Sequence, residues 1–206
     1  PDEQHPRTAT ISARHRKVFE YTNEFSGEAQ NNAVAIDKER YSLLSAEHAA
    51  TLPAGLWDIN QAFCAADWLA IHYQKKVVKT LQGGHVAAFL TAVGYLTYTD
   101  LLSTPVMIGG IISLMLFAVV NNALAVRGSW QRKYLDYRTL AEGLRVQFYW
   151  AAAGVTSGSV SKYAHDNFLQ KQDVELGWIR NVMRVAGMEC DVTPNLEPRG
   201  VQFAVQ

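Results

Sequence analysis

Two long apolar segments, separated by a short turn, constrain this chain more than any other feature. The first is Gly83–Leu102 and the second is Pro105–Val126, which carries no charged residue. Because a bilayer core of about 30 Å needs roughly 20 mostly apolar helical residues, the second segment is long enough to span it. The first contains three threonines and a histidine, so it is expected to insert together with its partner as a hairpin.

The distribution of charges around the two segments predicts how the hairpin is oriented. Cations flank both outer ends, and the turn Thr99–Pro105 has none; the cations are Lys75, Lys76, Lys79, Arg127, Arg132 and Lys133. Positive residues remain on the cytoplasmic side of a membrane. The sequence therefore predicts two spans with both termini cytoplasmic. The alternative is a buried hairpin inside a larger soluble helical protein.

Helical periodicity continues on both sides of the hairpin. Apolar residues recur every three or four positions from Leu56 to Gln82 and again after Arg127, which is typical of amphipathic helices. Between Glu28 and Thr51 the signal is more moderate. We predict an all-α membrane protein whose two-helix transmembrane hairpin continues into long cytoplasmic helices. Its expected parts are an N-terminal helical segment or linker (1–55), a stalk helix (56–82), the hairpin (83–126), C-terminal helices (127–187) and an extension (188–206) expected to continue beyond the chain.

Small and polar residues inside the hairpin are the candidate functional positions. Gly83 and Gly84 are a possible hinge where the stalk meets the first span, because paired glycines allow a helix to bend. Gly94 and Gly110 are candidates for close helix packing. The polar candidates are Thr91, Ser113, Asn121 and Asn122. These four either form hydrogen bonds between helices or line a water-filled path, and the path requires several subunits.

Catalytic chemistry has no recognisable signature in the sequence. The chain has no Gly-rich phosphate loop, no nucleophile with a base at a known spacing and no His or Cys cluster, and its two cysteines are far apart. We predict no enzyme activity, no catalytic residue, no metal and no cofactor. The formal net charge of zero implies no general electrostatic attraction to nucleic acid or acidic lipid, and we predict no direct nucleic-acid partner. The expected partners are the lipid bilayer, further copies of the chain and a sensor domain.

Two stretches carry a family resemblance. The segment Tyr134–Trp150 (YLDYRTLAEGLRVQFYW), together with Gln172–Arg180 (QDVELGWIR), resembles the C-terminal membrane region of bacterial proteins that begin with a SLOG domain of the TRPM-like kind. It is also similar to the wider SLATT group of two-span bacterial effectors. The resemblance covers roughly residues 56–184. It implies that Arg138, Glu142 and Arg145 are partners in a polar seam.

The resemblance implies a function in antiphage defence at the bacterial inner membrane. In such families a SLOG domain is thought to sense a nucleotide signal while the membrane part breaches the membrane, and no SLOG domain is present in this sequence. The expected function is an oligomeric effector that disrupts or permeabilises the membrane. The alternative is a membrane anchor or oligomerisation scaffold without catalysis, serving a cytoplasmic sensor or enzyme.

Overall fold

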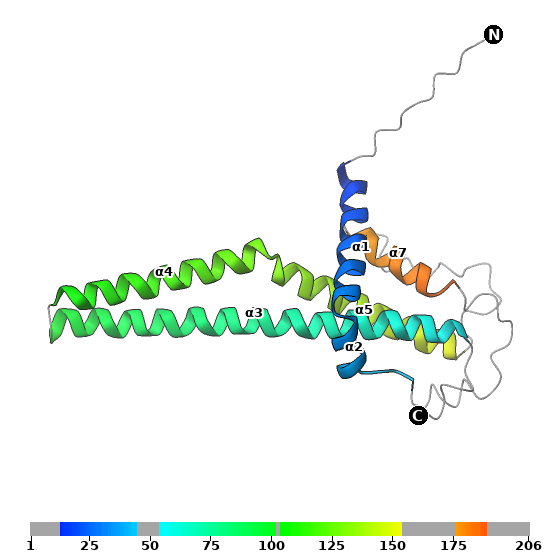
Figure 1. Cartoon of the computed structure of the whole chain (residues 1–206), viewed down its shortest axis with the longest axis horizontal. Helices are drawn as coiled ribbons and strands as arrows, with labels where there is room; N and C mark the ends of the chain where they lie inside the picture. Colours follow the sequence, from blue (N-terminus) through cyan, green and yellow to red (C-terminus); the bar gives the residue numbers. More distant parts are fainter. Residues whose placement is uncertain (1–12, 45–53, 102–103, 154–175, 189–206) are drawn as a thin grey trace, which may run out of the picture. The chain divides into compact units, whose positions relative to one another are not determined.

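The computed structural model describes residues 13–44, 54–101, 104–153 and 176–188, and all regular secondary structure in these ranges is helical (Figure 1). This confirms the all-α class for the described part of the chain. The helices are α1 (Ala13–Asn31), α2 (Ala33–Glu39), α3 (Ala54–Asp100), α4 (Pro105–Arg127), α5 (Trp130–Ala152) and α7 (Gly177–Ala186). They divide between two compact units. Residues 68–138 form one unit, and the described residues before 68 and after 138 form the other, so α3 and α5 each contribute to both.

The unit that contains both termini is built around apolar stripes on α3 and α5. On these two helices, fully buried side chains recur every three or four residues, as expected when one helix face packs into a core. They are Leu56, Ile59, Phe63 and Ala66 on α3, and Leu140, Leu144 and Phe148 on α5. The segment 134–150, which carries the family resemblance, therefore supplies a large part of this core.

Helix α7 completes the same core from the other end of the sequence. Trp178 and Ile179 are almost fully buried, and the Trp178 ring lies 5.9 Å from the ring of Phe25 on α1. Against α5, the Gln147 Nε2 donates a hydrogen bond of 3.0 Å to the carbonyl of Met183. A Cβ added at Gly143 would lie 2.8 Å from the Met183 sulfur. Glycine at 143 thus allows α7 to approach α5 closely.

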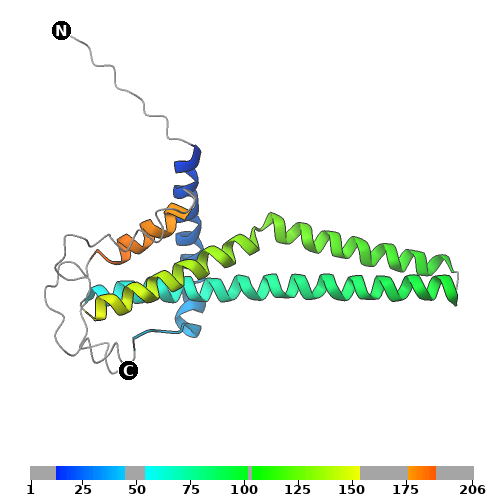
Figure 2. The same cartoon turned by 180° about the vertical axis from the view of Figure 1, so that it is seen from behind.

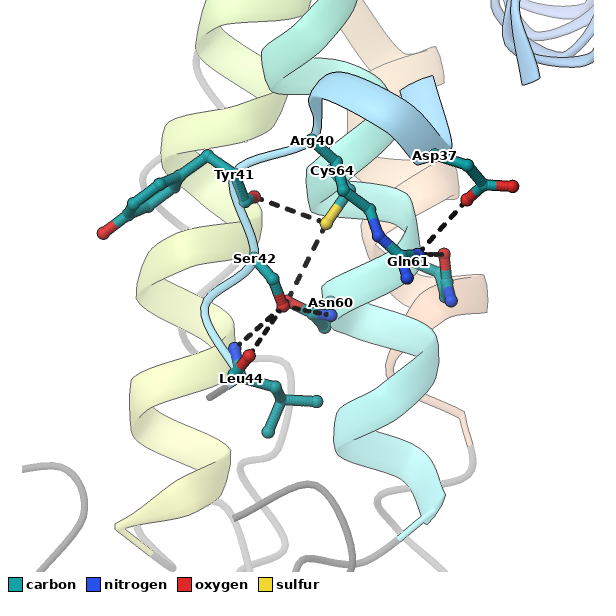
Figure 3. Close-up of polar contacts among 8 residues, drawn as sticks. All are labelled: Asp37, Arg40, Tyr41, Ser42, Leu44, Asn60, Gln61 and Cys64. Carbon is teal, nitrogen blue, oxygen red and sulfur yellow. Dashed lines mark hydrogen bonds and ion pairs between the residues drawn. The ribbon is translucent and has the colours of Figure 1, made fainter. Parts of the chain in front are cut away.

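Residues 40–44 leave the helical conformation and are held by the side chain of Asn60 on α3 (Figure 3). Asn60 is fully buried, and its Oδ1 accepts a hydrogen bond of 2.9 Å from the Leu43 N–H. Its Nδ2 donates to Ser42 Oγ at 3.1 Å, while the Ser42 hydroxyl donates to the Leu44 carbonyl at 2.9 Å. The side-chain amide of Asn60 therefore provides hydrogen bonds to this segment, which lies outside the helices.

This arrangement differs from the helical signal that the sequence gives from Glu28 to Thr51. The chain turns at Asn32, whose Nδ2 donates to the Glu28 carbonyl at 2.8 Å, and α2 ends before Arg40, which is extended. Asn side chains compete with the backbone for such hydrogen bonds, so they favour turns over helix interiors. Residues 45–53 lie outside the described ranges.

Cys64 lies one helical turn after Asn60 and is buried in the same network. Its thiol donates to the Tyr41 carbonyl at 3.4 Å. Burial raises the pKa of the Cys64 thiol to about 11, because the low-polarity surroundings disfavour the thiolate. The thiol is therefore a small neutral core group. The other cysteine, Cys190, lies outside the described residues.

Candidate membrane-spanning hairpin

Within the unit of residues 68–138, α3 and α4 run antiparallel and side by side (Figures 1 and 2). Two close approaches fix their register. A Cβ added at Gly94 would lie 3.4 Å from Ile111 Cγ1, and one added at Gly83 would lie 3.4 Å from Asn121 Nδ2. The Asn121 Nδ2 also donates a hydrogen bond of 3.0 Å to the Thr80 carbonyl. This register aligns the apolar parts of the two helices.

The aligned parts are similar in length. Residues 80–99 of α3 and 105–126 of α4 contain no Asp, Glu, Lys or Arg. At 1.5 Å per residue each extends about 30 Å, which matches a bilayer core. Among the described residues, α4 is the one helix that is long and apolar enough to cross a membrane. The most apolar stretch of α4 has a mean hydropathy of 2.0, and none of it is buried. The first predicted span is part of α3, which is 47 residues long and more polar.

The outer surface of the hairpin is apolar and exposed. Phe89 is 67% exposed, Val106 83% and Leu116 62%. Soluble monomers rarely leave such large contiguous apolar surfaces uncovered. Between residues 80 and 126, the other large apolar side chains that are exposed are Leu81, Val86, Leu90, Val93, Tyr95, Leu96, Leu101, Ile108, Ile112, Met115, Phe117, Val119, Val120, Leu124 and Val126.

The four predicted polar positions fall into two groups. Thr91 and Asn121 are half-buried, and Asn121 is bonded to α3 as described above. Ser113 and Asn122 are exposed, and the Ser113 hydroxyl donates to the Gly109 carbonyl of its own helix at 2.8 Å. Ser113 and Asn122 are nine residues apart, which is two and a half turns at about 3.6 residues per turn, so they lie on opposite sides of α4. The structure does not bring the four onto one face.

The predicted glycine positions also differ from one another. Helix α3 passes through Gly83 and Gly84 without a break, and only Gly83 lies close to α4. Gly94 is a close-approach point between the two helices. Gly110 is exposed and, like Gly109, has open space around it. Gly83 and Gly94 thus pack inside the hairpin, whereas Gly110 faces outward.

A break that the sequence reasoning missed separates α4 from α5. Ser129 has a φ of 50°, a left-handed conformation that non-glycine residues seldom adopt. A Cβ at Gly128 would lie 2.6 Å from Trp130 Cδ1 and would overlap the indole, so glycine is required while Trp130 folds back. The Gly-Ser pair was the signal for this break, because such pairs are a common cause of kinks.

A cluster of cations and aromatic rings lies at the same end of the hairpin. The Lys76 ammonium lies 4.8 Å from the centre of the Tyr73 ring and 5.7 Å from that of Trp130. Lys133 lies 5.2 Å from the Tyr73 ring, and Tyr73 packs against Tyr137 with their ring centres 5.9 Å apart. The cluster links α3 to α5 just beyond the apolar segments, and the sequence reasoning treated its cations only as topology signals.

Two residues of the polar seam implied by the resemblance, Glu142 and Arg145, form an ion pair. Arg145 Nη1 lies 3.1 Å from Glu142 Oε2, and the Arg145 guanidinium lies 5.4 Å from the ring of Phe63. Both charged side chains are partly exposed, so the pair contributes little to stability, on the order of 0–1 kcal/mol. Arg138 is exposed on α5. This geometry gives the seam a structural role.

No group of His, Cys, Asp and Glu side chains in the described ranges is arranged to hold a metal ion. The candidate functional surface is the exposed apolar hairpin together with the cations at its end. No protein-family model, curated protein or solved structure matches the chain.

Proposed function

We propose that α3 and α4 cross a membrane together as a two-span hairpin, and that several copies assemble to permeabilise it. The single observation that carries the proposal is the register: the charge-free parts of both helices lie alongside each other, and their outer side chains are apolar and exposed. The core helix of a soluble protein would be mostly buried, whereas the apolar stretch of α4 is 0% buried. The weaker α3 segment inserts because α4 accompanies it.

The packing between copies uses the outward small residues of α4. Gly109 and Gly110 have no atom within 4 Å of an added Cβ, and Ser113 is exposed nearby. In lipid, small residues on a helix face allow another helix to approach closely, which is the main source of association there. Because a single hairpin cannot enclose a path for ions, permeabilisation requires this assembly.

The biological setting of the proposal comes from the resemblance. The two stretches at 134–150 and 172–180 resemble SLOG-associated and SLATT-like bacterial effectors, and this resemblance supports a proposed role in antiphage defence at the inner membrane, with both termini cytoplasmic. A nucleotide-sensing SLOG domain is the expected regulator. Its ligand would act by binding the clustered state of the effector more tightly than the separate one.

Release of a dye from liposomes tests the proposal, together with membrane potential in bacteria that express the chain. Gly110→Leu should abolish most of the release, because the larger side chain keeps copies apart without touching its own hairpin. Ala123→Leu adds a larger side chain at another exposed position of α4 and is the matched control. Intact liposomes and polarised cells at high expression, with the wild-type chain inserted, would exclude permeabilisation.

One observation favours a second function, a membrane anchor or scaffold. Of the four predicted polar positions, Thr91 and Asn121 are half-buried, and Ser113 and Asn122 lie on opposite sides of α4, so these four form no continuous polar stripe for a pore. Replacing residues 80–126 with an unrelated two-span hairpin separates the two functions. A scaffold would retain its activity after this exchange, and a permeabilising effector would lose it.

A further inference from the structure

The two ends of the hairpin differ sharply in charge. Between residues 68 and 138 the sequence has seven cations, all at the end away from the turn: Lys75, Lys76, Lys79, Arg127, Arg132, Lys133 and Arg138. The same range contains two carboxylates, Asp100 beside the turn and Asp136 among the cations. The end opposite the turn is therefore strongly positive, although the whole chain has a formal net charge of zero.

The carboxylate of Asp136 does not neutralise this end. Arg132 Nη1 lies 3.3 Å from Asp136 Oδ2, so this acid is already engaged. Lys75, Lys79 and Arg127 are exposed, and the described residues contain no ion pair between these three and a carboxylate. Their charges are available to an anion from outside the chain.

Aromatic rings hold the middle of this surface in place. Lys76 lies over both the Tyr73 and Trp130 rings, which fixes its ammonium between α3 and the start of α5. Tyr and Trp are the residues that collect at the headgroup level of a membrane, because their rings are apolar and their tips polar. Thr80, the first residue of the charge-free part of α3, directly follows Lys79. The cations thus begin where the apolar surface ends.

We propose that this surface, the basic collar formed by Lys75, Lys76, Lys79, Arg127 and Trp130, binds the phosphodiester headgroups of anionic phospholipids. Anionic lipid is the occupant that the geometry favours, because the apolar hairpin begins at the next residue and puts the collar at headgroup depth. A polybasic segment at such a place gains about 1 kcal/mol per cation near an anionic surface, or roughly fivefold in binding per charge. The inference rests on the proposed membrane hairpin.

The test measures which lipid the full chain retains. The chain is reconstituted into bilayers of equal phosphatidylglycerol and phosphatidylcholine, extracted again in mild detergent, and the bound lipids are quantified by mass spectrometry. Wild type should retain phosphatidylglycerol more than about fivefold over phosphatidylcholine at low salt. The preference should vanish in about 1 M salt, where the screening length falls to roughly 3 Å.

A matched pair of triple variants assigns the preference to the collar. Lys75→Gln/Lys79→Gln/Arg127→Gln should lose most of the preference, because Lys76 is the one collar cation that remains. Arg16→Gln/Lys38→Gln/Arg184→Gln removes three exposed cations from helices α1, α2 and α7 and should behave as wild type. All six side chains are exposed, and circular dichroism of both variants checks that helix content is unchanged. Equal retention of both lipids by wild type, or the same loss in both triple variants, overturns the proposal.

Carbonate extraction of the same vesicles keeps the two proposals distinct. If the chain resists extraction but shows no lipid preference, it spans the membrane and the collar inference is wrong. If it prefers phosphatidylglycerol but is removed by carbonate, the collar inference holds and the spanning hairpin is wrong. A short DNA duplex serves as competitor. Displacement of phosphatidylglycerol by DNA at a lower phosphate concentration would assign the collar to nucleic acid and overturn the lipid proposal.

Discussion

Replacement of Asn60 by leucine tests whether the Asn60 side-chain amide stabilises the conformation of residues 40–44. Asn60 is 0% exposed, and its Oδ1 is the acceptor for the buried Leu43 N–H at 2.9 Å. Leucine has the same number and branching of side-chain heavy atoms as asparagine, so the change removes the acceptor without leaving a cavity. A buried donor that loses its partner costs about 1–3 kcal/mol. We therefore expect the Asn60→Leu variant to lose about 2 kcal/mol in local stability.

Hydrogen exchange at the Leu43 amide, resolved by fragmentation mass spectrometry, measures this loss directly. A loss of about 2 kcal/mol corresponds to roughly 30-fold faster exchange when opening is rapid. The matched control is Gln61→Leu on the next position of α3. Gln61 is half-exposed and only accepts a bond of 3.3 Å from Arg40, so its loss should change exchange at Leu43 little.

A double-mutant cycle completes this test. Ser42 Oγ accepts from Asn60 Nδ2, so Ser42→Ala should cost less in the Asn60→Leu background than in wild type. Residues of one hydrogen-bond network show coupling energies of about 0.5–3 kcal/mol. Unchanged exchange at Leu43 in Asn60→Leu, or an equal acceleration in Gln61→Leu, would refute the reasoning.

Four further predictions follow from the described contacts. Asn121→Leu should destabilise the hairpin by about 0.6–1.7 kcal/mol in a detergent titration, and Asn122→Leu, which alters an exposed neighbour, should not. Burial raises the pKa of the Cys64 thiol to about 11 in the folded chain, against an ordinary value of 9.0. Because the Cys64 thiol has a higher pKa in the folded chain than in the unfolded one, the free energy of unfolding should fall as pH rises from about 9 to about 11. The Cys64→Ala variant should lack this fall. Gly128→Ala should displace the Trp130 indole and change the near-ultraviolet circular dichroism, whereas Gly109→Ala, at an open position, should not. Phe148→Ala should cost about 3–5 kcal/mol in unfolding, and Tyr149→Ala, at a position 38% exposed, much less.

Regular periodicity explains why the helices could be predicted from sequence. The spacing of Leu56, Ile59 and Phe63 on α3 is sufficient to identify a buried helix face, because only a period near 3.6 places these residues together. The register of the hairpin was not predictable in the same way. It depends on which small residues meet, and Gly94 meets Ile111 whereas Gly110 meets nothing in its own chain.

Local sequence signals did not predict the features that depend on tertiary packing or on a single long-range hydrogen bond. Gly83 and Gly84 weaken a helix by only about 1 kcal/mol each, and α3 remains continuous through both, with Gly83 close to Asn121. The break came instead at Gly128 and Ser129, where Trp130 folds back. Asn60 gave no signal at all. Its acceptor role depends on Leu43, which lies 17 positions earlier and outside the helix.

The charge difference between the ends of the hairpin has a consequence for how such a hairpin would enter an energised membrane. The turn end carries the exposed Asp100, and residues 80–126 contain no Lys or Arg. Insertion with the collar inside moves one negative charge outward, which an inside-negative potential favours by about 2.3 kcal/mol per 100 mV. Copies that arrive first would insert with this assistance. If they then depolarise the membrane, they remove part of the driving force for later copies, so that insertion limits itself.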